Sequence, residues 1–368
     1  MFLTLLILLA AIVLAVPLSR YAGLGSILGY LTAGVIIGPS VLGLVNNVTE
    51  ISEVAELGVT MLLFLIGLEL RPHRLWVLRK AVFGMGLAQM VPTSLLLAGL
   101  LMLGGVAGRD AMVLGIGLAL SSTAIVLPLL SERNLLPTIP GRDAFAVLLF
   151  QDMAAIPVLA LLPILAGGGT EHFSWLAVLR GAAVVAGILA GGTLLVPYVF
   201  RMVASAKVPE VFTATALLLV VGTAALAHWA GLSSSLGAFL AGVMVSDSEY
   251  RHELQADIEP FEGLLLGFFF ISVGMSADLS LLLHKPFEIL FLVIGLTVVK
   301  TGIAFAVSHV RRHLTGAALR FATVLSEVSE FSFVLFAAAV AAGTLSKSLA
   351  AEATLVVALS MMVAPVLF

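Results

Sequence analysis

Thirteen long apolar stretches follow one another along this chain, from residues 2–19 to residues 349–367, with only short connections between them. About 20 consecutive apolar residues are needed for a helix to cross the hydrocarbon core of a bilayer. The chain is 61% hydrophobic and 11% charged, with a mean hydropathy of +1.19. These stretches leave no room for a soluble domain of ordinary size. The sequence therefore predicts an all-α polytopic membrane protein with about thirteen transmembrane helices.

Positive charges are distributed unequally between the two sides of the predicted membrane. Three Lys or Arg residues fall on the side of the amino terminus and thirteen on the opposite side. Cytoplasmic connections are enriched in Lys and Arg, so we expect a periplasmic amino terminus and a cytoplasmic carboxyl terminus. The first stretch has no basic segment before it and no small-residue cleavage site, and we expect it to be retained as a helix.

One segment of thirteen residues occurs twice, at residues 23–35 and at residues 231–243, with eight identical positions. The two copies fall in the second and the ninth stretch. An odd separation of seven means that they cross the membrane in opposite directions. The pattern predicts an inverted repeat of six helices each, at 1–174 and 208–368, joined by a linker helix at 175–207. Secondary transporters built in this way bind their ions near the midplane, between the halves.

Polar runs interrupt two stretches at matching places in the two halves. The fifth stretch contains three consecutive hydroxyl residues and Pro128, and the twelfth contains two carboxylates among hydroxyls: Ser121, Ser122 and Thr123, then Ser326, Glu327, Ser329 and Glu330. Unwound backbone at membrane depth is tolerated only where it lines a cavity or is buried in protein. These runs predict two interrupted helices whose freed carbonyls could bind a cation. Alternatively, the hydroxyls bond back to their own helices and the Glu residues pair internally.

Asp152 and its neighbour Gln151 lie deep in the sixth stretch, with Asp152 about 15 Å from the cytoplasmic end at the rise of a helix. An ionisable group at that depth costs several kcal/mol, so it usually marks an ion pathway or a partner. Lys300 is the one cation placed similarly, about 21 Å from the opposite end of its helix. We expect the two to meet. Burial favours the protonated form of a carboxyl, whereas a neighbouring ammonium favours its ionised form. These opposing influences would let Asp152 exchange a proton for a cation. A buried ion pair that only stabilises the fold is the alternative.

Nearly the whole chain resembles the membrane domain of the glutathione-gated potassium efflux antiporters, the Kef type of the monovalent cation:proton antiporter superfamily. Five strings carry the resemblance: Gly67–Leu70, Ser121–Ala124, Val147–Asp152, Gly237–Val243 and Asp257–Phe261. The resemblance implies potassium:proton antiport in the bacterial inner membrane by a homodimer, in which a mobile core domain moves past a dimerisation domain as an elevator.

The resemblance also implies roles for individual residues. Gln151 and Asp152 match the family's cation site, and Asp152 would bind the potassium ion and the proton in turn. Ser121, Ser122 and Thr123 match a crossed, broken helix, and Lys300 matches the family's basic residue. One carboxylate suggests one cation exchanged for one proton. The family's potassium-selective members carry Gln-Asp, so potassium is favoured as the substrate.

A charged loop follows the ninth stretch and contains His252, Glu253, Asp257 and Glu259. In the family this cytoplasmic loop contacts a nucleotide-binding regulatory domain that responds to glutathione. We expect that domain, with its nucleotide and glutathione, outside this chain, and no cofactor within it. The sequence departs from the family pattern at Gln255, where relatives usually place an acid, and at Glu327, where they usually place Gln. An ordinary solvated loop is the other interpretation.

Two further functions stay open on the sequence. A sodium:proton antiporter differs only in the cation, whereas an uncoupled, ligand-gated potassium channel would need a continuous pore and would not move protons. An intramembrane enzyme is not expected, because the sequence contains none of the motifs His-Glu-x-x-His or Gly-x-Ser-x-Gly and no paired catalytic Asp within the membrane.

Overall fold

The computed structural model describes residues 2–22, 25–45, 48–69, 72–165, 175–194, 196–205, 208–230, 234–276, 279–311 and 314–367. These residues form seventeen helices and no strand. In chain order the helices are α1 (Phe2–Tyr21), α2 (Gly25–Ile37), α3 (Val48–Glu69), α4 (Pro72–Leu103), α5 (Gly108–Ala119), α6 (Thr123–Glu132), α7 (Ile139–Leu165), α8 (Trp175–Leu194), α9 (Val196–Ser205), α10 (Pro209–Trp229), α11 (Ser234–Val245), α12 (Arg251–Ser276), α13 (Leu279–His284), α14 (Pro286–Val310), α15 (Thr315–Val324), α16 (Phe331–Ala341) and α17 (Lys347–Leu367).

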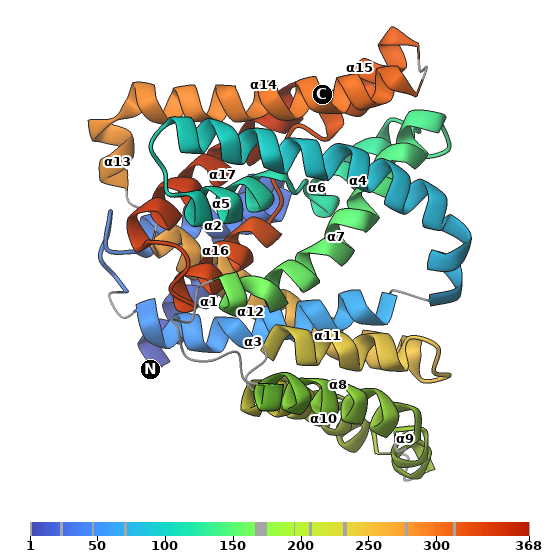
Figure 1. Cartoon of the computed structure of the whole chain (residues 1–368). Helices are drawn as coiled ribbons and strands as arrows, with labels where there is room; N and C mark the ends of the chain where they lie inside the picture. The colour runs from blue at the N-terminus through green and yellow to red at the C-terminus, as the bar shows by residue number, and fades with distance from the viewer. Residues whose placement is uncertain are drawn as a thin grey trace.

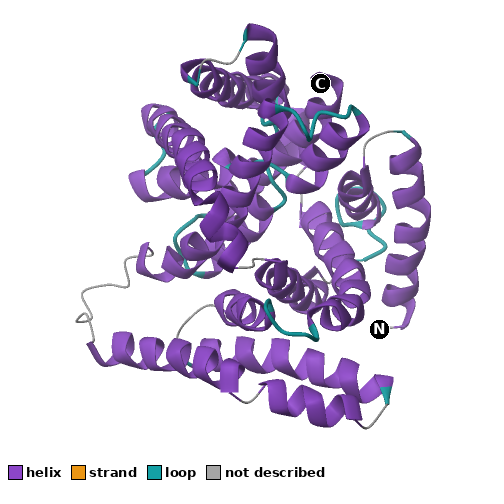
Figure 2. Ribbon diagram, turned by 90° about the vertical axis from the view of Figure 1, so that its right-hand side faces the viewer, coloured by secondary structure: helices purple, strands orange, loops and turns teal. Residues whose placement is uncertain are grey.

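The helices form two groups that lie side by side (Figure 1). In the first group α3 packs against α11 and α12, α2 packs against α1 and α12, and α10 packs against α11, with α8 and α9 beside them. In the second group α4 packs against α5, α7 and α14, while α15 and α16 both pack against α7. Figure 2 shows α1 standing along one edge of the molecule, where it contacts chiefly α2. The all-helical fold class is thereby confirmed.

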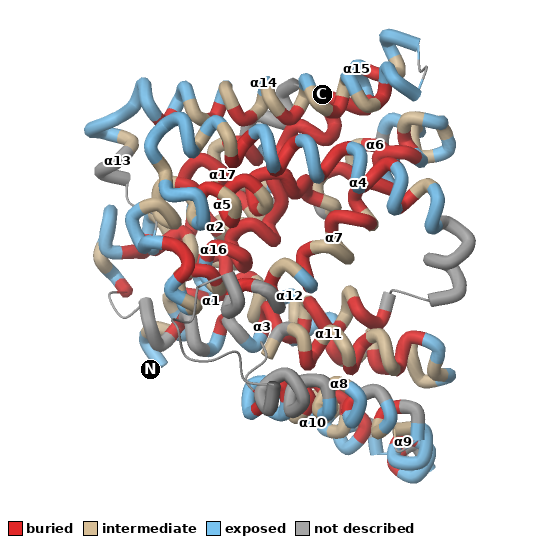
Figure 3. Tube along the Cα trace, in the orientation of Figure 1, coloured by how far each residue is buried: buried red, intermediate tan, exposed pale blue. Residues whose placement is uncertain are grey.

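The outward faces of the helices are apolar, as a bilayer requires. Buried residues gather where helices meet, whereas exposed residues recur along the outer sides of α14 and of α4 from residue 79 onwards (Figure 3). The exposed side chains include Phe287 and Phe291 of α14, and Leu3 and Leu14 of α1. In lipid such side chains meet acyl chains rather than water, so this exposure costs nothing there.

Five of the described helices are long and apolar enough to cross a membrane on their own: residues 2–21, 79–103, 210–229, 251–276 and 286–310. The pair 183–192 and 196–203, bent by 41°, could form one more span. The other expected spans are shorter helices, such as α2 with 13 residues and α11 with 12, or pairs of half-helices. The protein is a multi-pass membrane protein, and the count of thirteen spans stays a prediction.

Proline and glycine mark the ends of several helices. Pro209 and Pro286 stand at the first positions of α10 and α14, where the missing N–H is one that a helix leaves unpaired in any case. Gly105 and Gly343 follow α4 and α16 with φ of 89° and 74°. Glycine adopts this left-handed conformation without steric cost, which ends a helix sharply.

Two glycines of the repeated segment bring helices into backbone contact. A Cβ built on Gly34 of α2 would lie 2.1 Å from the carbonyl oxygen of Ile271 in α12, and one on Gly242 of α11 would lie 2.0 Å from that of Phe64 in α3. The two contacts are related by shifts of 208 residues for the glycines and 207 for the carbonyls. Only glycine permits so close an approach of two helices.

A second pair of contacts follows the same rule. Gly29 of α2 faces the carbonyl oxygen of Ala15 in α1, and Gly237 of α11 faces that of Thr223 in α10. Both residues of the pair are shifted by 208. These are the contacts that the predicted repeat requires of the first three helices in each half. The complete six-helix halves and their boundaries at 174 and 207 stay predictions.

Candidate cation and proton site

Both expected helix interruptions are present in the structure. α5 ends at Ala119 and α6 begins at Thr123, with Leu120 and Ser122 in extended conformations between them. In the second half α15 ends at Val324 and α16 begins at Phe331. We call residues 120–122 the first interruption and residues 325–330 the second interruption. The polar runs of the sequence therefore predicted both positions correctly.

The two interruptions are hydrogen-bonded to each other. The backbone N–H of Ser329 donates to the Leu120 carbonyl at 3.1 Å, and the Ser121 hydroxyl donates to the Leu325 carbonyl at 2.9 Å. The Ser332 hydroxyl adds a bond of 2.7 Å to the Gly117 carbonyl in α5. Backbone groups freed by each interruption are thus satisfied by the other one. Ser326 alone follows the alternative expectation, because its hydroxyl bonds back to the Thr323 carbonyl at 2.7 Å.

Gln151 on α7 holds the end of α5 in place. Its Oε1 accepts the Ser121 N–H at 2.8 Å, and its Nε2 donates to the Gln89 Oε1 at 2.7 Å and to the Ala119 carbonyl at 3.3 Å. The side chain is 1% exposed. Both amide hydrogens and one oxygen lone pair are therefore used within the protein. Gln89, fully buried on α4, was not predicted as a site residue, although a lone amide in an apolar stretch is a signal for it.

Asp152 follows Gln151 on α7 and reaches the start of α6. The Thr123 hydroxyl donates to its Oδ2 at 3.0 Å, and both residues are partly exposed. Ser122 caps the same helix by accepting the N–H of Ile125 at 3.3 Å. A helix amino terminus carries a partial positive charge that favours a nearby anion. The structure thus presents one accessible carboxylate at the positive end of a half-helix.

Lys300 on α14 is fully buried, and its ammonium lies where the two interruptions meet. Nζ donates to the carbonyls of Leu120 and Glu327, each at 2.5 Å. The expected contact with Asp152 is not formed. The reason is electrostatic and local, because α5 and α15 both end here and helix carboxyl termini attract a cation.

The two carboxylates of the second interruption have different surroundings. Glu330 accepts a hydrogen bond from the Ser329 hydroxyl at 3.4 Å, and the Ser122 hydroxyl lies close to its carboxyl. It directly precedes α16, whose first N–H donates to the Ser329 hydroxyl at 3.2 Å. Glu327 is 1% exposed, and within the part of the chain that the structure describes neither oxygen of its carboxyl has a hydrogen-bond partner. The second interruption therefore joins the predicted site through Ser122, Ser121 and Lys300, but its carboxylates are buried.

The predicted regulatory loop is a helix. Residues 251–260 form the first turns of α12, because Leu254 and Ile258, four residues apart, are both fully buried against the helices of the first group. His252, Glu253 and Glu259 are exposed on this helix, and Asp257 accepts the Thr213 hydroxyl at 2.7 Å. The expectation of a loop was wrong, because it relied on the density of charged residues and did not use the spacing of Leu254 and Ile258. A regulatory role for these residues stays a prediction.

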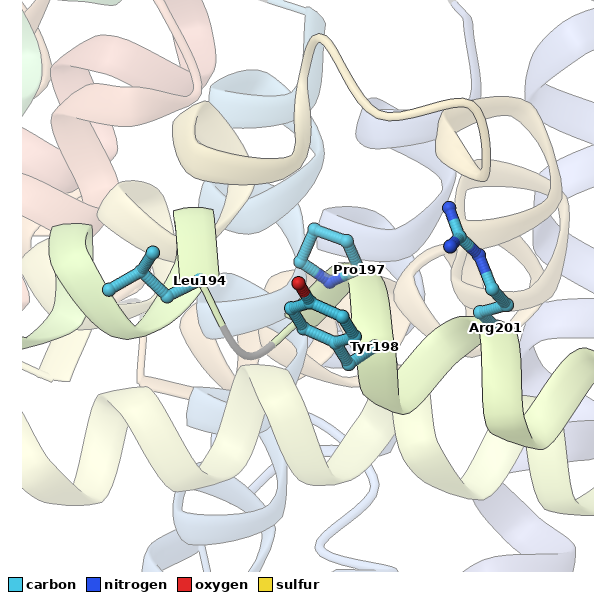
Figure 4. A pocket seen from close by; sticks show the side chains of 4 residues that line it. All are labelled: Leu194, Pro197, Tyr198 and Arg201. Atoms are coloured by element: carbon cyan, nitrogen blue, oxygen red, sulfur yellow. The ribbon is translucent and has the colours of Figure 1, made fainter.

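We call the place where the two interruptions bond to each other the crossing. An open pocket of about 230 Å³ lies elsewhere, at the bend between α8 and α9. It is lined by Leu194, Pro197, Tyr198 and Arg201 (Figure 4). Arg201 also lies 3.9 Å from Glu249, with both side chains exposed. None of the four described residues that line this pocket is a carboxylate, so the accessible carboxylate of Asp152 is the better candidate for cation binding. Within the described residues, no cluster of three or more His, Asp or Glu side chains suited to a metal is present.

Comparison with known proteins identifies the fold and the family of the chain. Two solved structures of the sodium proton antiporter MjNhaP1 from Methanocaldococcus jannaschii have a similar fold, each with a TM-score of 0.66. The structure at pH 8 is 18% identical and the alignment covers 98% of this chain and 94% of that chain; for the electron microscopy map the values are 17%, 99% and 93%. Residues 5–368 match the family described as sodium/hydrogen exchanger, transmembrane. Because this match spans almost the whole sequence, the chain belongs to the sodium/hydrogen exchanger family of cation:proton antiporters.

Proposed function

We propose that this antiporter exports potassium in exchange for protons and that Asp152 binds the two in turn. The observation that carries the proposal is the accessible carboxylate of Asp152 beside an interrupted helix, bonded to Thr123 at 3.0 Å. A carboxylate in a site of low dielectric binds either a proton or a cation, because each removes the cost of an uncompensated charge. Competition for one group couples the two fluxes.

Thr123 and Gln151 contribute to this exchange in different ways. A threonine hydroxyl can donate to the carboxylate or turn its oxygen towards a cation, so Thr123 can serve both states of Asp152. Gln151 already uses its amide to hold Ser121, Ala119 and Gln89. Its contribution is therefore to position the first interruption rather than to replace water around the ion.

Potassium is the favoured cation for two reasons. The Gln-Asp pair resembles that of the Kef-type potassium antiporters, and one carboxylate with neutral oxygens forms a weak field that suits the more easily dehydrated ion. Sodium is the second candidate, and it is favoured by the description of the family and by the similar antiporter structures. The proposal includes the homodimer, the bacterial inner membrane and the periplasmic amino terminus expected from the sequence. A cytoplasmic regulatory domain that binds nucleotide and glutathione would act from outside this chain.

The test is transport in proteoliposomes that hold a pH-sensitive dye. An outward potassium gradient should acidify the lumen and an equal sodium gradient should do so less. Asp152→Ala should abolish the response, whereas Asp247→Asn, a change at an exposed acid after α11, should leave it unchanged. Proton movement that persists in Asp152→Ala would remove the proposed site. Cation flux that cannot move protons against their gradient would favour the channel alternative, and a larger response to sodium would reassign the cation.

A further inference from the structure

Glu327 carries a buried carboxyl group in the second interruption. The residue is 1% exposed, and among the described residues neither carboxyl oxygen has a hydrogen-bond partner. The backbone carbonyl of the same residue, in contrast, accepts the Lys300 ammonium at 2.5 Å. The Lys300 ammonium therefore donates to backbone carbonyls and does not form a hydrogen bond with the Glu327 carboxyl.

The charged neighbours of this carboxyl are few. Of the charged groups on described residues, Glu330 in the second interruption and Lys300 on α14 are the two that act on it. Asp152 on α7 accepts the Thr123 hydroxyl at the start of α6, and Glu330 accepts the Ser329 hydroxyl. An ionised carboxylate buried without a hydrogen bond or a paired cation costs several kcal/mol, and such a group takes up a proton instead.

We propose that Glu327 is a second proton-binding site of the exchanger. In the conformation described here the carboxyl holds a proton. The carboxyl takes this proton from water on the periplasmic side. When the two interruptions separate towards the cytoplasm, Lys300 leaves the carbonyls of Leu120 and Glu327, the proton passes to cytoplasmic water, and the ammonium pairs with the new carboxylate until the carboxyl faces the periplasm again. This step rests on the proposed function, because it adds one proton to the one that Asp152 exchanges for the cation.

The consequence is a transport ratio of two protons per cation in place of one. Such a cycle moves net charge, so its equilibrium differs from that of a one-to-one exchanger. With the membrane potential held near zero, the pH gradient that stops net proton flux is about half as large for two protons as for one at the same cation gradient.

The experiment measures this balancing pH gradient for the full chain in vesicles. A tenfold potassium gradient, with sodium in a parallel series, is opposed by a series of pH gradients while a chloride carrier and equal chloride hold the potential. Glu327→Gln, which keeps the shape but cannot release a proton, should raise the balancing gradient about twofold. Glu327→Asp should keep the wild-type value, and so should Glu288→Gln, a change at an exposed acid that pairs with Lys285 at 3.0 Å. Equal balancing gradients for wild type and Glu327→Gln would overturn the proposal.

A second measurement applies even if Glu327→Gln does not transport. Infrared spectra of the reconstituted protein should contain a protonated carboxyl band at neutral pH that disappears in alkali, and this band should be missing in Glu327→Gln and retained in Asp152→Asn. A spectrum of Glu327→Gln identical to wild type would overturn the second proton site. The two proposals fail separately: exchange that survives in Asp152→Ala removes the first, while an unchanged carboxyl band removes only the second.

Discussion

Helices are held together in different ways at the crossing of the two interruptions and at the glycine contacts of the first helix group. At the crossing, backbone carbonyls have lost their helical partners and are bonded by Lys300, Ser121, Ser332 and Gln151. In the first group the helices that meet at these glycines, α1 to α3 and α10 to α12, are continuous, and the glycines allow backbones to touch. The crossing depends on specific polar atoms, whereas the first group depends on the absence of side-chain atoms. We therefore expect substitutions at the crossing to reduce transport and substitutions at the glycines to reduce stability.

The largest effect is expected for Lys300→Met. Two buried carbonyls, of Leu120 and Glu327, would lose their charged donor, and an unsatisfied buried polar group costs about 1–3 kcal/mol. We expect transport to be lost and the stability to fall by about 3 kcal/mol, seen as a lower midpoint in thermal unfolding of the purified protein. Lys300→Arg is the control that keeps the charge. Normal transport by Lys300→Met would mean that the crossing does not depend on this ammonium.

The crossing also separates what sequence patterns can predict from what they cannot. Polar runs stand out in apolar stretches, so the interruptions at Ser121–Thr123 and Ser326–Glu330 were predictable. Their partners were not, because the bonds of Lys300 join residues 180 and 27 positions apart. The predicted depth of Lys300 in the membrane suggested a pair with Asp152. The structure instead places its ammonium at the carboxyl ends of α5 and α15.

Gln89 and the start of α12 show two other limits. Gln89 has no neighbouring polar run, and its importance depends on a contact with Gln151 that is 62 positions away. In α12, the alternation of Leu254 and Ile258 with charged residues is typical of a helix with one buried face. Charge density alone is compatible with a loop or with such a helix, and only packing against α3 and α10 decides between them.

Glycine substitutions test the other side of the comparison. Gly34→Ala and Gly242→Ala would each place a methyl group about 2 Å from a carbonyl oxygen. Overpacking of this kind costs about 1–3 kcal/mol, so both should lower the unfolding midpoint to a similar extent, as matched positions of a repeat. Gly84→Ala on α4 is the control, since nothing lies within 4 Å of the added Cβ. A large loss for one variant and none for the other would contradict the matched packing.

Gln89→Leu should affect transport more than stability. The change leaves one amide hydrogen of Gln151 unpaired and frees its side chain to turn away from Ser121. A lost buried hydrogen bond costs about 1.5 kcal/mol, or about tenfold in rate if the whole loss falls on the transport step. The maximal rate should fall, with a smaller change in the cation concentration for half-maximal rate. Gln89→Glu, which keeps an acceptor for Gln151, should recover part of the rate, and an unchanged rate in Gln89→Leu would contradict a positioning role.

The smallest effect is expected for Thr123→Val, which removes one hydroxyl and preserves shape. The hydroxyl donates to Asp152 at 3.0 Å, and a hydrogen bond at a partly exposed site contributes about 1 kcal/mol. Because that hydroxyl can face the carboxylate or the cation, the half-saturating cation concentration should rise about fivefold with little change in the maximal rate. Thr123→Ser should restore the wild-type value. The contrast with Gln89→Leu is informative, since one residue acts on binding directly and the other acts through the position of the first interruption. A lower maximal rate with normal half-saturation in Thr123→Val would place this hydroxyl among the positioning groups instead.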